Sequence, residues 1–180
     1  PRRIHPAPHP PPTRHPLMRF AYADPPYPGM AHRYPENTEV DHAQLIAELV
    51  DGFPDGWALS TSSVALQQIL ALCPMDVRVM AWVKPFAVFK QNVNPAYAWE
   101  PVIVQGGRKR TRSQLTVRDW VAVNITLRKG VVGAKPEGFC QWLFQVLNVE
   151  DGDELVDLYP GTGIVTTEFD RLSTAGVLFA

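Results

Sequence analysis

The chain has 180 residues, of which 46% are hydrophobic, and its formal net charge at pH 7 is −1. This length and composition predict one folded α/β domain, and the near-zero charge excludes an overall electrostatic attraction to nucleic acid or membranes. No apolar run approaches the length of a membrane span, nothing resembles a secretory signal, and neither Cys73 nor Cys140 has the spacing of a metal ligand, so we expect a soluble intracellular protein without a metal.

Residues 1–16 are rich in proline and histidine and offer few apolar side chains to bury. Proline removes backbone donors and restricts φ, so this segment is expected to be an extended tail. Its histidines could bind a metal, but the segment has no scaffold to hold a coordination geometry. The folded domain is therefore expected to span residues 17–180.

An apolar run from Leu17 to Ala23 leads directly into Asp24-Pro25-Pro26-Tyr27. The run predicts a buried strand, and open α/β sheets bind their ligands at the carboxyl ends of strands. The two prolines stiffen the loop and leave backbone carbonyls free to accept hydrogen bonds. Asp24 and the Pro25 carbonyl could accept both N–H groups of an exocyclic amine while Tyr27 stacks on its base. The alternative is a strand that simply ends in a proline-rich turn.

The next elements alternate between helix and strand, after a polar loop over residues 28–39 that contains Arg33. Apolar spacing predicts helices at 41–50 and 64–72 and strands at 57–60 and 77–83, hence a mostly parallel sheet with helical crossovers. A further strand at 97–104 is expected to run antiparallel to its predecessor, forming a long hairpin at the sheet edge.

A short basic insertion follows at residues 105–118, with Arg108, Lys109, Arg110 and Arg112 close together. Arginine is suited to phosphate contacts and to reading guanine, although a charge run is usually a solvated loop. The apolar, β-branched segment 119–127 then predicts a strand or an extended stretch.

The last third of the chain contains two further motifs. Lys135-Pro136 opens a predicted helix at 137–147, where proline suits the first turn. A strand then runs through Asp157 into Gly161-Thr162-Gly163, and a helix begins near Val165. Glycines allow positive φ and close approach of a ligand to the backbone, although one Gly-x-Gly is a weak signal by itself.

Taken together, these motifs resemble those of the amino-directed DNA methyltransferases, which modify adenine N6 or cytosine N4. Asp24-Pro25-Pro26-Tyr27 resembles their catalytic motif, and the glycine turn resembles their motif for S-adenosyl-L-methionine (AdoMet). The order, catalytic motif first and cofactor motif last, is that of the circularly permuted β class. The resemblance covers residues 19–172 and implies a Rossmann-like AdoMet-dependent methyltransferase fold.

The resemblance implies methylation of adenine N6 in DNA by a small phage or bacterial enzyme in the cytoplasm, with the target adenine flipped out of the duplex. It assigns catalysis to Asp24, Pro25, Pro26 and Tyr27, and cofactor contacts to Asp24, Lys135, Pro136, Phe139, Asp157, Tyr159, Gly161, Thr162 and Gly163. DNA contacts are expected from Arg33, Arg108, Lys109, Arg110 and Arg112.

The sequence departs from the family pattern at two points. Pro160 stands next to the first glycine, and the expected last strand, Gly176–Ala180, lacks the family's ribose-binding acid. Cytosine-N4 methylation, RNA adenine methylation and an inactive nucleic-acid-binding relative therefore stay open, as does a homodimer or a partner subunit.

Overall fold

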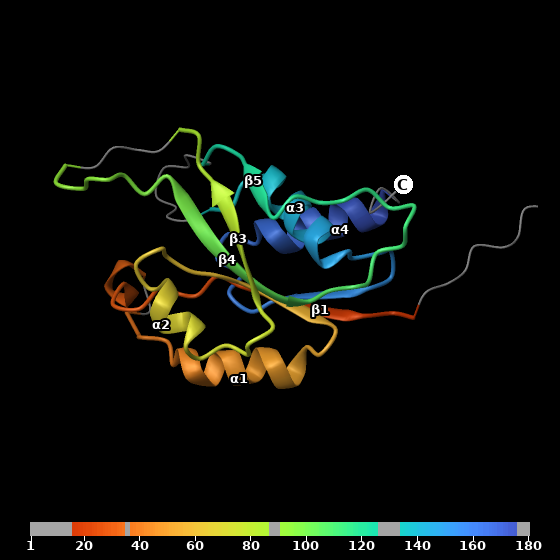
Figure 1. Ribbon diagram of the computed structural model, residues 1–180, viewed down its shortest axis with the longest axis horizontal. Coiled ribbons are helices and arrows are strands. Elements are labelled where there is room, and N and C mark those ends of the chain that lie inside the picture. The colour runs from red at the N-terminus through yellow and green to blue at the C-terminus, as the bar shows by residue number, and fades with distance from the viewer. Residues whose placement is uncertain (1–15, 35–36, 87–90, 126–133, 176–180) are drawn as a thin grey trace, which may run out of the picture.

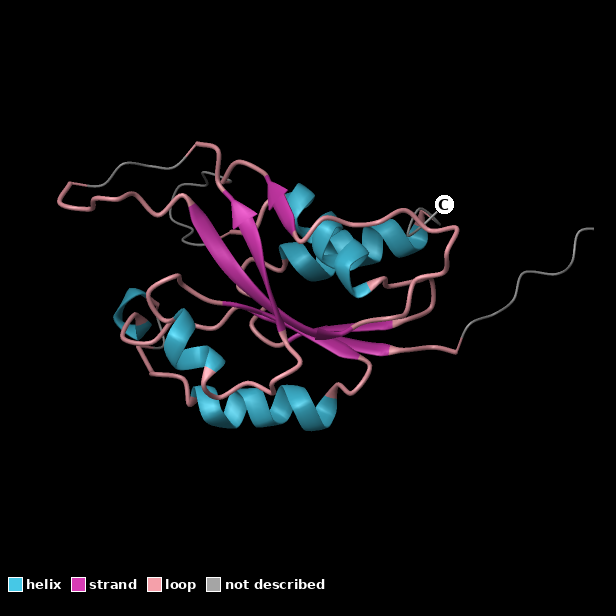
Figure 2. Ribbon diagram, viewed as in Figure 1, coloured by secondary structure: helices cyan, strands magenta, loops and turns pink. Residues whose placement is uncertain are grey.

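The structure is a computed structural model that describes residues 16–34, 37–86, 91–125 and 134–175. A twisted six-stranded sheet is sandwiched between helices α1 and α2 on one face and α3 and α4 on the other (Figures 1 and 2). The strands are β1 (Arg19–Ala23), β2 (Gly56–Ser60), β3 (Arg78–Val83), β4 (Trp99–Gly106), β5 (Trp120–Ala122) and β6 (Glu154–Asp157). The helices are α1 (His42–Gly52), α2 (Leu66–Leu70), α3 (Glu137–Leu147), α4 (Ile164–Thr174) and the 3₁₀ helix η1 (Ala31–Arg33).

The strand order is β5-β3-β4-β2-β1-β6. Strand β1 pairs in parallel with β2 and β6, and β3 pairs in parallel with β5, whereas β4 runs antiparallel to both β2 and β3. The predicted mixed α/β class and the antiparallel pairing of β3 with β4 are confirmed. The hairpin is not the edge of the sheet, however, because β5 pairs with the free side of β3. This pairing satisfies backbone groups that would otherwise be exposed, as when the Ala81 N–H donates to the Asp119 carbonyl at 3.0 Å.

Alternation along β1 builds two separate cores, one on each face of the sheet. Phe20 and Tyr22 pack toward α3 and α4, while Ala21 and Ala23 pack toward α1 and α2. Both faces of β1 are buried, as expected for a central parallel strand. Asp24, the next residue, therefore emerges at the end of a rigid strand on the face toward α3.

Most helices and strands begin and end within a few residues of the positions predicted from the sequence, and the exceptions have local causes. The helix expected at 64–72 is shortened to α2, because the Ser62 hydroxyl accepts from the Ala65 N–H at 3.1 Å and the preceding residues form a turn. Of the strand expected at 119–127, only β5 forms. The tail at 1–15, residues 126–127 and the expected last strand Gly176–Ala180 lie outside the described residues, so the division into tail and domain stays a prediction.

Candidate functional site

Asp24 and Asp157 lie at the same edge of the sheet, on neighbouring strands. Strands β1 and β6 are parallel and in register, with Tyr22 opposite Asp157, and the Leu158 N–H donates to the Tyr22 carbonyl at 2.9 Å. The structure therefore brings together two predicted motifs that are 133 residues apart in sequence (157 − 24). We call this edge the catalytic edge; it is where open α/β sheets bind ligands.

The glycine turn after β6 borders open space. Gly161 and Gly163 have φ values of +49° and +71°, and the Gly163 N–H donates to the Pro160 carbonyl at 2.6 Å before α4 begins. An added Cβ would meet nothing within 4 Å at Gly163 and only the Tyr159 carbonyl, at 3.9 Å, at Gly161. The turn is thus shaped by backbone conformation and leaves room for a ligand to approach the backbone.

A chain of alternating charges is built around Asp24. The Lys135 ammonium lies 3.0 Å from Asp24 Oδ1 and 2.5 Å from Glu100 Oε1, and Glu100 Oε2 accepts from Lys84 at 2.9 Å. The side chains of Lys135 and Glu100 are only 4% and 8% exposed, whereas that of Asp24 remains 21% exposed. We call these four residues the charge network; its two acids and two bases balance, and its outer members, Asp24 and Lys84, keep 21% and 18% of their side chains exposed.

Burial and neighbouring charges set the protonation of the network. Burial raises the pKa of Asp24, and Lys135 offsets part of that effect. Burial alone would also raise the pKa of Glu100, but the ammonium groups of Lys135 and Lys84 outweigh it and hold this pKa below its ordinary value. For Lys135, burial would lower the pKa, and the two carboxylates together raise it instead. Lys135 therefore stays a cation that holds two carboxylates in place.

Aromatic side chains enclose this network. Rings of Trp82 and Phe139 lie 5.3 and 5.7 Å from the Lys135 ammonium, within the range of cation–π attraction. The Tyr27 hydroxyl points toward Asp24, at 3.5 Å, and burial followed by the charges of Glu100 and Asp24 raises the Tyr27 pKa well above its ordinary value. Tyr27 is therefore a neutral aromatic ring beside the acid.

Two residues expected to touch a cofactor are buried in the structure, and their cofactor contacts stay a prediction. Phe139 is fully buried, its ring 5.3 Å from that of Trp82 and 5.9 Å from that of Tyr22. Pro136 is also buried and occupies the N-cap of α3. Both are neighbours of Lys135: Pro136 follows it in the sequence, and the Phe139 ring lies 5.7 Å from its ammonium. By contrast, Asp157, Tyr159 and Thr162 keep exposed surface, and burial raises the pKa of Asp157 to about 6.

The basic insertion begins at the edge opposite Asp24. Because β4 is antiparallel to β2, Gly106 pairs with Gly56 while Val102 pairs with Ser60, so the insertion starts four residues, or about 13 Å, below the level of the catalytic edge. Arg108 is committed to the fold: its side chain is nearly buried and lies 2.6 Å from Asp153 and 3.4 Å from Glu150. The DNA contact expected of Arg108 stays a prediction, and in the structure its guanidinium pairs with two carboxylates of the protein.

The other expected DNA contacts have different surroundings. Arg110 donates to the carbonyls of Leu115 and Gln145, the latter near the end of α3. Lys109 and Arg112 are exposed and form no ion pair with any described residue, and the same holds for Arg33 in η1. Arg33 follows the Asp24 loop directly and so lies nearer the catalytic edge.

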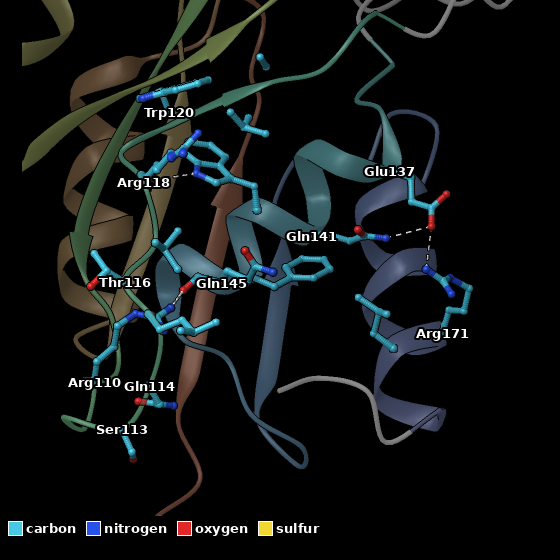
Figure 3. Close-up of a pocket in the computed structure, with 17 residues that line it drawn as sticks. Arg110, Ser113, Gln114, Thr116, Arg118, Trp120, Glu137, Gln141, Gln145 and Arg171 are labelled. Atoms are coloured by element: carbon cyan, nitrogen blue, oxygen red, sulfur yellow. Dashed lines mark hydrogen bonds and ion pairs between the residues drawn. The ribbon is translucent and has the colours of Figure 1, made fainter. Parts of the chain in front are cut away.

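A broad cleft of about 1160 Å³ runs along the outer face of α3 (Figure 3). Arg110, Ser113 and Gln114 stand at one end, and the ion pair of Glu137 with Arg171, at 2.8 Å, stands at the other. Between them the Arg118 guanidinium lies 5.2 Å from the Trp120 ring. Apart from Arg110, none of the predicted site residues lines this cleft.

Glu100 and Lys84 are the residues that motif reading did not assign a role. The signal that could have found them is charge in an apolar context: Lys84 directly follows the predicted strand 77–83, and Glu100 lies within the predicted strand 97–104. Within the described residues no group of three or more His, Cys, Asp or Glu side chains is placed to hold a metal, and both cysteines are free. No helix in the described ranges is long and apolar enough to cross a membrane.

The sequence matches no family model and no curated protein. The structure, however, resembles solved structures. One is M1.HpyAVI in complex with SAM, with a TM-score of 0.60, 14% identity, and coverage of 87% of this chain and 79% of that one. M1.HpyAVI alone gives a TM-score of 0.56 and 12% identity over 87% and 77% of the two chains. A presumed DNA modification methylase from Thermus thermophilus, TTHA0409, gives 0.51 and 18% over 86% and 76%.

The chain has a DNA methyltransferase fold. At these identities the likeness concerns the fold alone. Within this fold, Asp24 and the glycine turn follow neighbouring parallel strands, β1 and β6, and so lie side by side at the catalytic edge. What the site does must be argued from its own side chains.

Proposed function

We propose that the chain is an AdoMet-dependent methyltransferase that modifies adenine N6 in DNA and has the circularly permuted motif order of the β class. The observation that carries the proposal is the position of Asp24-Pro25-Pro26-Tyr27 beside Asp157 and the glycine turn on adjacent parallel strands. The M1.HpyAVI complex with SAM supports it through fold alone.

The residues at the catalytic edge fit AdoMet. The open space at Gly161 and Gly163 would admit a ligand against the backbone, and Asp157 keeps a carboxylate facing that edge. Tyr159 and Thr162 complete this surface, and Asp24 borders it from β1. When bound there, AdoMet would supply a methyl group attached to a positively charged sulfonium sulfur, which is already a good leaving group. The protein therefore needs no covalent nucleophile of its own.

Asp24 and the Pro25 carbonyl would accept the two N–H bonds of a flipped adenine amine, and Tyr27 would stack on its ring. As the N–C bond to the methyl group forms and the S–C bond breaks, sulfur would leave as a neutral thioether and the nitrogen would gain positive charge. The nitrogen would then lose a proton to solvent by way of the Asp24 carboxylate. The Asp24 carboxylate stabilises this charge, and Lys135 fixes its orientation through the 3.0 Å ion pair. Lys135 and Glu100 are positioning residues in this scheme, since both are buried behind Asp24.

The choice of adenine rests on two arguments. An aspartate at the first motif position is commoner in the adenine-directed members of the resembled family, and a purine offers Tyr27 the larger stacking face. For DNA, Arg33 is the candidate contact nearest the flipped base, and Lys109, Arg110 and Arg112 would meet phosphates farther along the duplex.

Calorimetric titration with AdoMet tests the cofactor part of the proposal. The wild-type protein and Asp24→Ala should both bind, because Asp24 serves mainly the amine, whereas Gly161→Val should not. Absence of binding by wild-type protein that is folded by circular dichroism would contradict the proposal and favour an inactive relative on the same fold.

A further inference from the structure

Exposed aromatic side chains gather at the catalytic edge. Four aromatic side chains in the described ranges are more than a third exposed, namely Phe86, Tyr97, Trp99 and Trp120. Phe86 and Tyr97 belong to the connection between β3 and β4, which projects beyond the sheet at the left of Figure 1, and Trp99 is the first residue of β4. Exposing aromatic rings to water costs free energy and does not stabilise the fold. Their concentration around one connection therefore indicates a binding surface.

Part of this connection, together with Trp99 and Ser63 in the turn after β2, lines an open cavity of about 320 Å³. Tyr97 and Trp99 supply aromatic surface, Asn92 and Asn94 supply amides, and Ser63 supplies a hydroxyl; among the described residues that line the cavity, none carries a carboxylate. A volume of this size suits one flat, polar-edged group rather than an extended polymer.

The cavity adjoins the charge network but opens on the other face of the sheet. Side chains alternate along β4, so Glu100 faces α3 with Val102 and Val104, whereas Trp99 shares the face of Ile103, toward α1 and α2. Trp99 and Glu100 are consecutive, which keeps their Cα atoms about 3.8 Å apart. A strand whose target base reaches Asp24 would therefore pass close to this cavity.

We infer that this cavity is a stacking site for a second, unpaired nucleobase of the DNA, next to the target base; the inference rests on the proposed function. Bases stack on exposed aromatic rings regardless of sequence, and asparagine amides can pair with base edges. The absence of acids among the lining residues removes the repulsion that a phosphate would otherwise meet. A lipid tail would use the rings but would leave the two amides and the hydroxyl unpaired.

The experiment distinguishes binding to the bases from binding to the sugar–phosphate backbone. Fluorescein-labelled thymidine 12-mers and 12-mers of abasic sites carry the same phosphates, and thymine has no exocyclic amine for Asp24 to bind. Fluorescence anisotropy at low salt gives the affinity ratio between the two probes. Trp99→Ala and Tyr97→Ser should each lower this ratio about 5-fold or more, as expected when one stacked base is lost. Trp99→Phe should retain it.

Trp120→Ala is the matched control, because Trp120 is 43% exposed and Trp99 is 40% exposed, but Trp120 lies on β5 outside this cavity. It should leave the ratio unchanged. Equal binding of the two probes by wild-type protein, an unchanged ratio in both cavity variants, or an equal loss in Trp120→Ala would each overturn the inference. AdoMet titration of the same samples reports separately on the proposed function and on whether each variant is folded.

Discussion

Replacing Lys135 by methionine is the sharpest test of the charge network. The substitution keeps the length of the side chain but leaves Asp24 and Glu100 as two carboxylates that have lost their shared cation, at 3.0 and 2.5 Å. Breaking a buried ion pair by removing one partner costs on the order of 3–5 kcal/mol. We expect a loss of unfolding free energy in the upper half of that range at pH 7, because the Glu100 side chain is only 8% exposed and would retain Lys84 as its single cationic partner.

The assay is urea unfolding at pH 5 and pH 7, with Arg78→Met as the control. Arg78 forms an exposed 3.7 Å pair with Asp119, which should be worth less than about 1 kcal/mol. Without Lys135 both carboxyl groups would have folded pKa values above their unfolded ones. Ionising them then costs stability as pH rises, so the deficit of Lys135→Met should be larger at pH 7 than at pH 5. A loss no greater than that of Arg78→Met, or no dependence on pH, would refute the account.

Four further predictions each rest on a single feature of the structure. Gly161→Val should abolish AdoMet binding in calorimetry, while Gly29→Val, also at positive φ (+76°) but outside the glycine turn, should bind normally. Burial raises the pKa of Asp157 in the folded protein to about 6, so ionising this carboxyl between about pH 4 and pH 6 destabilises the wild type. Asp157→Asn removes that cost, and it should be more stable than wild type at pH 7.5 and equal to it at pH 3.5. Equal thermal midpoints at both pH values would exclude this. Arg108→Ala should cost about 3–5 kcal/mol in urea unfolding because it strips Asp153 of a buried partner. In contrast, Lys109→Ser with Arg112→Ser should leave stability unchanged and lower the salt slope of DNA binding by about 2, and an unchanged slope would show that these residues are only solvated.

Much of the fold could be predicted because local pattern and tertiary packing agree. The apolar run before Asp24 is buried on both faces, and the helix at 137–147 has one apolar face, so periodicity identified both elements. The placement of β5 could not be predicted in this way. Its three residues carry little periodic signal, and its existence depends on the free side of β3, which is a tertiary property.

The site was predictable to the extent that its residues belong to contiguous motifs. Asp24 and the glycine turn were found from short sequences, and the pairing of β1 with β6 brings them together. Glu100 joins the network because β4 doubles back against β3, a hairpin that the sequence predicted, but no local motif marked Glu100 as a partner of Lys135. The same reversal carries Arg108 to the edge opposite Asp24, where Asp153 holds it.

The central claim is that Asp24 directs methyl transfer to an adenine amine. The most direct measurement is incubation of the protein with AdoMet and duplex DNA, followed by digestion to nucleosides and mass analysis, with Asp24→Ala in parallel. The account predicts N6-methyladenine with the wild-type protein and none with Asp24→Ala, although that variant still binds AdoMet. Methylation found only on cytosine would contradict the base assignment. N6-methyladenine at equal yield from Asp24→Ala would contradict the catalytic role of Asp24 itself.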